Sequence, residues 1–133
     1  MKVVLDTNVL VSALYFGGTP ARILGAWSDG RFVMLASLEI LAKYGRVVDR
    51  LELQHPSVGA RRILNLIVRE CRIIDAPPAP TTACDDPDDV KGLACALAGG
   101  ATCVVSGDRA LLRASGFEGV EVVTPRTFAV RNL

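Results

Sequence analysis

The sequence predicts an α/β fold in which a five-stranded parallel sheet is covered by helices on both faces. Short apolar segments alternate along the chain with segments whose apolar residues recur at helical spacing, a pattern typical of parallel β-α-β units. The short segments are apolar throughout, as expected for strands buried on both faces. The chain has 133 residues and shows no repeat, low-complexity tract or linker, so we expect one domain over residues 1–133.

Five short apolar runs predict the strands. Each is rich in Val, Ile or Leu and is followed by residues that favour turns or helix caps, which is typical of buried strands. The predicted strands cover residues 3–5, 32–36, 72–74, 103–106 and 120–123.

Capping residues define the helices of the first half of the chain. Residues 8–14 carry apolar side chains at helical spacing, and the glycine pair at 17–18 is expected to end this helix. Thr19 is expected to cap the next helix, because Pro20 then occupies the first helical position, where proline is favoured. Ser37 is expected to cap a third helix that reaches about residue 51.

The helices of the second half surround a proline-rich loop. Ser57 is expected to cap a helix with one apolar face, and residues 75–87, which contain four prolines, are expected to form a loop. The remaining helices are expected over residues 88–98 and 109–114, and from the Thr124-Pro125 pair onward.

Composition excludes several classes of protein. The net charge of +1 predicts no general affinity for polyanions, and no apolar run reaches the roughly 18 residues needed to span a membrane. The four cysteines form no CxxC pair and there is a single histidine, which argues against a zinc site or a disulfide framework. We therefore expect reduced thiols in a cytoplasmic protein. The signatures GxGxxG, GxxxxGK[ST] and GxSxG are absent.

Three aspartates occupy positions where open parallel sheets bind ligands. Asp6 follows the first predicted strand, Asp108 follows the fourth, and Asp89 lies in the first turn of the helix that leads into the fourth. Ligands of such sheets bind beyond the carboxyl ends of the strands. If the first and fourth strands are neighbours, the three carboxylates meet.

A carboxylate cluster at this place points to a divalent metal. Clustered carboxylates repel one another unless a cation neutralises them, and hard oxygen ligands favour Mg²⁺ or Mn²⁺. Such a site binds phosphate oxygens and activates water. Each aspartate has a simpler alternative role as a helix cap or as a charge at a helix N-terminus.

Several segments resemble the motifs of PIN-domain nucleases. Residues 4–14 are similar to the first motif, Asp86 to Asp89 with residues 94–101 to the third, and residues 106–112 to the fourth. The closest branch is the group of PIN toxins that act in toxin–antitoxin pairs. The resemblance implies a three-layer α/β/α fold with strand order 3-2-1-4-5, in which the first and fourth strands are neighbours.

The resemblance also implies an activity and a set of site residues. It implies Mg²⁺- or Mn²⁺-dependent cleavage of RNA, with Asp6, Asp89 and Asp108 as the catalytic and metal-binding acids. Asn8 and Ser106 match the polar supports of the family's pocket, and Asp86 belongs to the third motif. The expected partners are an RNA substrate, a cognate antitoxin protein and a second copy of the chain in a homodimer.

Two positions lack an acid that the family pattern carries. Lys43 stands where the family carries an acid, and Ala110 stands where it often carries a further aspartate; Glu39 lies one helical turn before Lys43. Either Lys43 pairs with the acids and weakens metal binding, or it points away from a three-acid site. A catalytically degenerate domain that binds RNA or protein is therefore the alternative to a nuclease.

Basic residues on the predicted helices after the second strand form a candidate RNA-binding surface. The alternative is that they form an ordinary solvated helix face. These residues are Arg46, Arg50, Arg61, Arg62 and Arg69.

Overall fold

Five parallel strands form one sheet in the order β3-β2-β1-β4-β5, which confirms the predicted fold class and strand order. The computed structural model describes residues 1–56, 59–77 and 87–133. Each strand begins and ends within one residue of its predicted bounds. The strands are β1 (Lys2–Leu5), β2 (Val33–Ala36), β3 (Arg72–Ile73), β4 (Cys103–Val105) and β5 (Glu121–Val123).

The central strand β1 sets the register of the sheet. Val3 lies opposite Met34 of β2 on one side and opposite Cys103 of β4 on the other. Val3 and Val4 are completely buried, because helices cover both faces of the sheet. This burial explains why residues 3–5 of β1 are all apolar instead of alternating.

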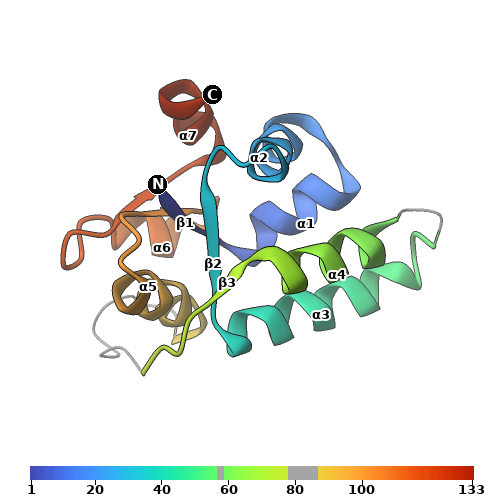
Figure 1. Ribbon diagram of the computed structural model, residues 1–133, viewed down its shortest axis with the longest axis horizontal. Coiled ribbons are helices and arrows are strands. Elements are labelled where there is room, and N and C mark those ends of the chain that lie inside the picture. Colours follow the sequence, from blue (N-terminus) through green and yellow to red (C-terminus); the bar gives the residue numbers. More distant parts are fainter. Residues whose placement is uncertain (57–58, 78–86) are drawn as a thin grey trace.

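Helices lie on both sides of the sheet (Figure 1). Helix α5 packs on β1, β2 and β4, whereas α1 to α4 lie together on the other side of β2. Helices α3 and α4 pack against each other and extend away from the sheet as a two-helix arm (Figure 1). The helices are α1 (Thr7–Tyr15), α2 (Gly18–Ser28), α3 (Leu38–Glu52), α4 (Ala60–Glu70), α5 (Pro87–Gly99), α6 (Arg109–Arg113) and α7 (Pro125–Asn132).

Among the described residues, no single helix is long and apolar enough to cross a membrane; only the pair α1 and α2, bent by 97° at their junction, passes that test of length and composition.

Two of the predicted caps are formed by side-chain hydrogen bonds. The Ser37 hydroxyl accepts from the Ile40 backbone N–H at 3.2 Å and begins α3. The Thr124 hydroxyl accepts from the Thr127 N–H at 3.1 Å and begins α7. Each hydroxyl satisfies a backbone donor that the first helical turn leaves without a partner.

The prediction that Thr19 caps α2 is wrong. The helix begins at Gly18, and Gly17 is its cap. Both glycines have positive φ, 77° and 67°, which lets the chain turn into the helix before Thr19 is reached. Pro20 is tolerated in the first turn because its missing N–H would have no helical partner there. The predicted cap Ser57 lies outside the described residues, where α4 begins at Ala60.

The described cysteines are free and buried, as the absence of a CxxC pair led us to expect. They are Cys71, Cys95 and Cys103; Cys84 lies outside the described residues. Burial, reinforced by the neighbouring Cys71 thiol, raises the pKa of Cys95 to about 11. Cys95 is therefore a small core residue that stays protonated at neutral pH.

We predict that Gly100→Ala lowers the free energy of unfolding by about 1 kcal/mol, because Gly100 has a φ of 71°. Gly100 follows the C-terminus of α5, where the Ala101 N–H donates to the Ala96 carbonyl at 2.8 Å. Urea denaturation measures the change. Gly45→Ala in α3 is the control, since an added Cβ meets no atom within 4 Å there. Equal losses in both variants would contradict the prediction.

We predict that stability falls as the pH rises from about 9 to about 11. The Cys95 thiol of the unfolded chain ionises near its ordinary value of 9.0, while the folded thiol keeps its proton. Unfolding then releases a proton, so a higher pH favours the unfolded chain. Urea denaturation across this range should give a shallower dependence on pH for Cys95→Ala than for the wild type. Identical slopes would show that Cys95 does not contribute to the pH dependence of stability.

Candidate active site

The pairing of β1 with β4 brings Asp6 next to Ser106 at the carboxyl edge of the sheet. The Asp6 backbone N–H continues this pairing by donating to the Val105 carbonyl at 2.9 Å. Ser106 continues the neighbouring pairing by donating its N–H to the Val123 carbonyl at 2.9 Å. The two residues after β1 and β4 are thus held by backbone hydrogen bonds at the edge where ligands of such sheets bind.

The Ser106 hydroxyl joins two of the predicted acids. It donates to Asp6 Oδ2 at 2.6 Å and accepts from the Asp108 backbone N–H at 2.9 Å. Ser106 is completely buried, so its hydroxyl depends on these two partners. Because both bonds share one oxygen atom, Ser106 fixes the position of Asp6 relative to the loop that carries Asp108.

Asp89 reaches the same cluster from the first turns of α5. It is buried, and its interaction with the Asp108 carboxyl is the largest cause that lowers the pKa of Asp108. Partial burial of Asp108 opposes this shift, whereas the Ala110 N–H and the charges of Arg113 and Lys43 reinforce it. Carboxylates placed this close repel one another, and a divalent cation would relieve that repulsion.

Asp6 and Asp108 also cap helices, the simpler role considered for them from the sequence. Asp6 Oδ1 accepts from the Thr7 N–H at 2.8 Å and begins α1, while Oδ2 bonds to Ser106. Asp108 Oδ1 accepts from the Ala110 N–H at 3.1 Å and begins α6. Capping and clustering are therefore compatible, since a carboxylate has two oxygen atoms and several lone pairs. The caps fix the direction of both carboxylates.

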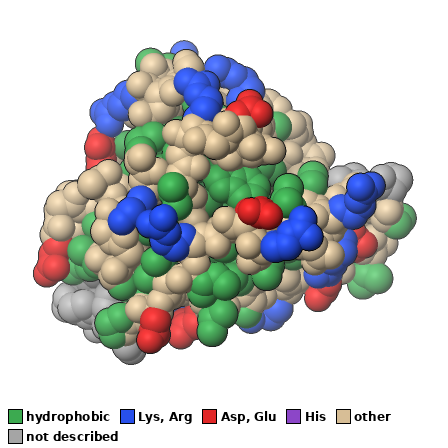
Figure 2. Space-filling view, viewed as in Figure 1, with side chains coloured by type: hydrophobic (Ala, Val, Ile, Leu, Met, Phe, Trp, Pro, Cys, Tyr) green, Lys and Arg blue, Asp and Glu red, His purple; other side chains and the backbone are tan. Residues whose placement is uncertain are grey.

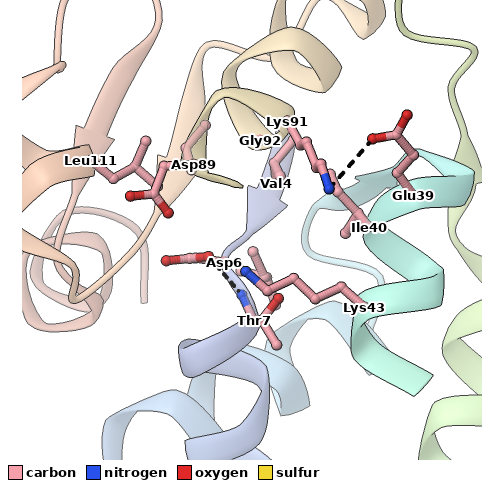
Figure 3. Close-up of a pocket in the computed structure, with 12 residues that line it drawn as sticks. Val4, Asp6, Thr7, Glu39, Ile40, Lys43, Asp89, Lys91, Gly92 and Leu111 are labelled. Carbon is pink, nitrogen blue, oxygen red and sulfur yellow. Dashed lines mark hydrogen bonds and ion pairs between the residues drawn. The ribbon is translucent and has the colours of Figure 1, made fainter. Parts of the chain in front are cut away.

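Lys43 lines the pocket from the side of α3. Asp6, Asp89 and Lys43 line one pocket, and the Lys43 side chain extends from α3 toward Asp6 (Figure 3). Glu39 lines the rim of the pocket and forms an ion pair with Lys91 of α5 at 3.8 Å. The acid one turn before Lys43 therefore faces a lysine and not the aspartates (Figure 3).

The expected site residue Asn8 does not line the pocket, whereas Thr7 and Lys91 line it but were not predicted. Asn8 is exposed, whereas its neighbour Thr7 is buried and lines the pocket. Asp86 lies outside the described residues. Lys91 lines the pocket although the sequence gave no reason to place it there, because a residue two positions from Asp89 belongs to a different helix face.

The candidate RNA-binding arginines are distributed along the two-helix arm. Figure 2 shows basic side chains over this arm and over other parts of the same face, with acidic side chains among them. Arg61 forms an ion pair with Asp49, and Arg69 forms one with Glu70 at 3.5 Å. Exposed pairs of this kind are weak, so a phosphate can replace the carboxylate in either pair.

The donor set of the pocket fits a hard divalent cation better than a soft one. Asp6, Asp89 and Asp108 contribute only oxygen atoms, which favours Mg²⁺ or Mn²⁺. Within residues 1–56, 59–77 and 87–133, no three His, Cys, Asp or Glu side chains are arranged to hold a metal ion by themselves. Mg²⁺ commonly uses one or two carboxylates and completes its shell with water and substrate oxygens. Asp89 and Asp108, whose carboxyl groups interact, supply two such carboxylates.

We predict that Ser106→Ala destabilises the protein by about 1–3 kcal/mol, because the substitution leaves the half-buried Asp6 carboxylate and Asp108 N–H without their partner. Urea denaturation measures this loss. Ser115→Ala is a matched control, since Ser115 is exposed and its hydroxyl accepts a single bond from the Val122 N–H. A smaller loss of stability for Ser106→Ala than for Ser115→Ala would contradict the role of Ser106 as the link between Asp6 and Asp108.

Comparison with known proteins identifies the family. The sequence matches the profile of the PIN domain over residues 2–110, a span that contains Asp6, Asp89 and Asp108. A comparison with curated proteins gives no significant match. The structure is similar to the crystal structure of PAE2754 from Pyrobaculum aerophilum, with a TM-score of 0.63 and 17% identity, over 98% of this chain and 88% of that one. PIN domains are typically nucleases that use divalent metal ions. The chain belongs to the PIN domain family.

Proposed function

We propose that this PIN domain is a metal-dependent endoribonuclease of the kind that serves as the toxin of a toxin–antitoxin pair. The observation that carries the proposal is the linked cluster of three acids. The Asp89 carboxyl acts on that of Asp108, and Ser106 connects Asp108 to Asp6 at the carboxyl edge of the sheet. Clustered acids that perturb one another's pKa, one of them buried, are typical of functional sites.

Asp89 and Asp108 are the proposed holders of a Mg²⁺ or Mn²⁺ ion, and Asp6 faces the same space. When bound, the ion supplies a Lewis acid that polarises a phosphate oxygen and lowers the pKa of water. The chain's own contribution is orientation: the Thr7 and Ala110 N–H groups fix the carboxylates of Asp6 and Asp108. The pocket has room for about one water molecule, so the phosphodiester lies at its mouth while the bases remain outside.

The arginines of the two-helix arm are proposed to guide the RNA backbone toward this mouth. Exposed guanidinium groups bind phosphates without reading sequence, and their contribution decreases as salt rises. The position of the arginines supports this role, because Arg46 and Arg50 lie on α3, the helix that also carries Lys43.

The proposed partners follow from the toxin role. A cognate antitoxin protein would hold the nuclease inactive in the cytoplasm, and we propose that the chain forms a homodimer. Four large apolar side chains are mostly exposed and are candidate positions for contact with a protein partner. These residues are Phe16, Leu38, Leu53 and Val130.

A second candidate function is a domain that binds RNA or protein without cleaving. Two observations favour it: Lys43 points into the pocket, and Glu39, the acid of the preceding turn, is paired with Lys91. Ala110, where the family often carries an acid, lies at the start of α6 and provides no carboxylate.

We predict that Asp89→Asn reduces Mn²⁺-dependent RNA cleavage by more than about 100-fold. The amide cannot replace the negative carboxylate toward a cation, but it retains the size and hydrogen-bonding capacity of Asp89. Cleavage of a fluorescent single-stranded RNA and thermal denaturation should be measured together. Asp29→Asn, at an exposed turn after α2, is the control and should cleave like the wild type.

If the wild-type chain binds this RNA but leaves it intact at millimolar Mn²⁺ and Mg²⁺, the binding-domain alternative replaces the nuclease proposal. Equal cleavage by the wild type and Asp89→Asn would also overturn it, because the activity would then come from elsewhere.

A further inference from the structure

Lysine is scarce in this chain and is concentrated at the pocket. Of the 15 basic residues, only Lys2, Lys43 and Lys91 are lysines. Lys43 and Lys91 line the same pocket as Asp6 and Asp89. Lys2 is at the opposite end of β1, where its ammonium group donates to the Gly99 carbonyl at 3.3 Å. An acidic pocket thus contains two of the three lysines.

The two pocket lysines differ in what they face. Lys91 forms an ion pair with Glu39 at the rim, so these two charges compensate each other. Lys43 extends toward Asp6, and its charge also acts on Asp108 (Figure 3). Lys43 is therefore the ammonium group that faces the aspartate cluster.

The position of Lys43 is fixed by its neighbours in α3. Ile40, Leu41 and Tyr44 are buried and set the rotation of the helix. The hydroxyl of Tyr44, the residue after Lys43, donates to the carbonyl of Leu5, the residue before Asp6. This buried hydrogen bond ties the helix carrying Lys43 to the strand end carrying Asp6, so the distance between the two charges is constrained.

The formal charges of the aspartate cluster and Lys43 favour one divalent cation over two. Asp6 and Asp89 of the pocket and the neighbouring Asp108, together with the Lys43 ammonium group, carry a formal charge of −2 when all three acids are ionised, because the Lys91–Glu39 pair is neutral. A single divalent cation balances this charge, and a second would leave the pocket positive. A glutamate at position 43 would instead give −4, which two divalent cations balance.

Building on the proposed nuclease function, we propose that Lys43 takes the place of a second cation. The site binds one divalent ion beside Asp89 and Asp108, and the Lys43 ammonium group binds a non-bridging oxygen of the substrate phosphodiester on the Asp6 side. An ammonium group is a strong donor to phosphate oxygens and needs no carboxylate ligands of its own. Lys43 is then a substrate-binding residue whose role is independent of the metal.

Binding of RNA without metal tests this role separately from cleavage. The probe is a fluorescent 2′-O-methyl oligouridylate in EDTA, measured by anisotropy against salt concentration. Lys43→Gln should weaken binding about five- to tenfold at low salt and reduce the salt slope by about one. Lys43→Arg should restore most of the affinity. Lys2→Gln removes the same charge outside the pocket and should bind like the wild type. Equal affinity for Lys43→Gln and the wild type would overturn the proposal.

Calorimetric titration with Mn²⁺ tests the charge balance. The wild type should bind one ion at the pocket, and Lys43→Glu should bind two or bind the first more tightly. Two ions in the wild-type pocket would overturn the role of Lys43 as a substitute cation. Neither readout requires cleavage, so an inactive wild type that still loses RNA affinity in Lys43→Gln would refute the nuclease proposal and leave the phosphate contact established.

Discussion

The pairing of β1 with β4 at the carboxyl edge of the sheet is the constraint on which the candidate site depends. The Asp6 N–H extends this pairing to the Val105 carbonyl and places the Asp6 carboxylate beside Ser106. Ser106 then holds the loop that carries Asp108, and Asp108 meets Asp89 from α5. Backbone pairing therefore places Asp6 and Ser106 at the edge of the sheet, and the Ser106 hydroxyl then links the Asp6 carboxylate to the Asp108 backbone.

The sequence was sufficient to predict the strands, which were identified as buried apolar runs. The positions of Asp6 and Asp108 after strand ends predicted a candidate site, and the structure places Ser106 between these two residues. The order of the strands came from the resemblance to PIN domains, because periodicity does not show which strands are neighbours. Thr19 was predicted wrongly because a glycine pair with positive φ begins α2 earlier than a standard cap would.

The side chains around the acids were harder to predict. Asn8 and Thr7 are adjacent in sequence, but the rotation of α1 buries Thr7 against the pocket and exposes Asn8. Lys91 of α5 reaches the rim because it forms an ion pair with Glu39 of α3. Such contacts depend on how α3 and α5 pack, which the sequence of neither helix reveals alone. The contrast between Glu39 and Lys43 shows how one helical turn separates a rim position from a position inside the pocket.

We propose that Asp89 and Asp108 hold one divalent cation next to Asp6. Anomalous diffraction from crystals soaked in Mn²⁺ would locate this cation. We expect one anomalous peak within coordination distance of both the Asp89 and the Asp108 carboxylates, with Lys43 on the far side of Asp6 and no second peak between them. A pocket without a peak at millimolar Mn²⁺, or two peaks that displace Lys43, would contradict it.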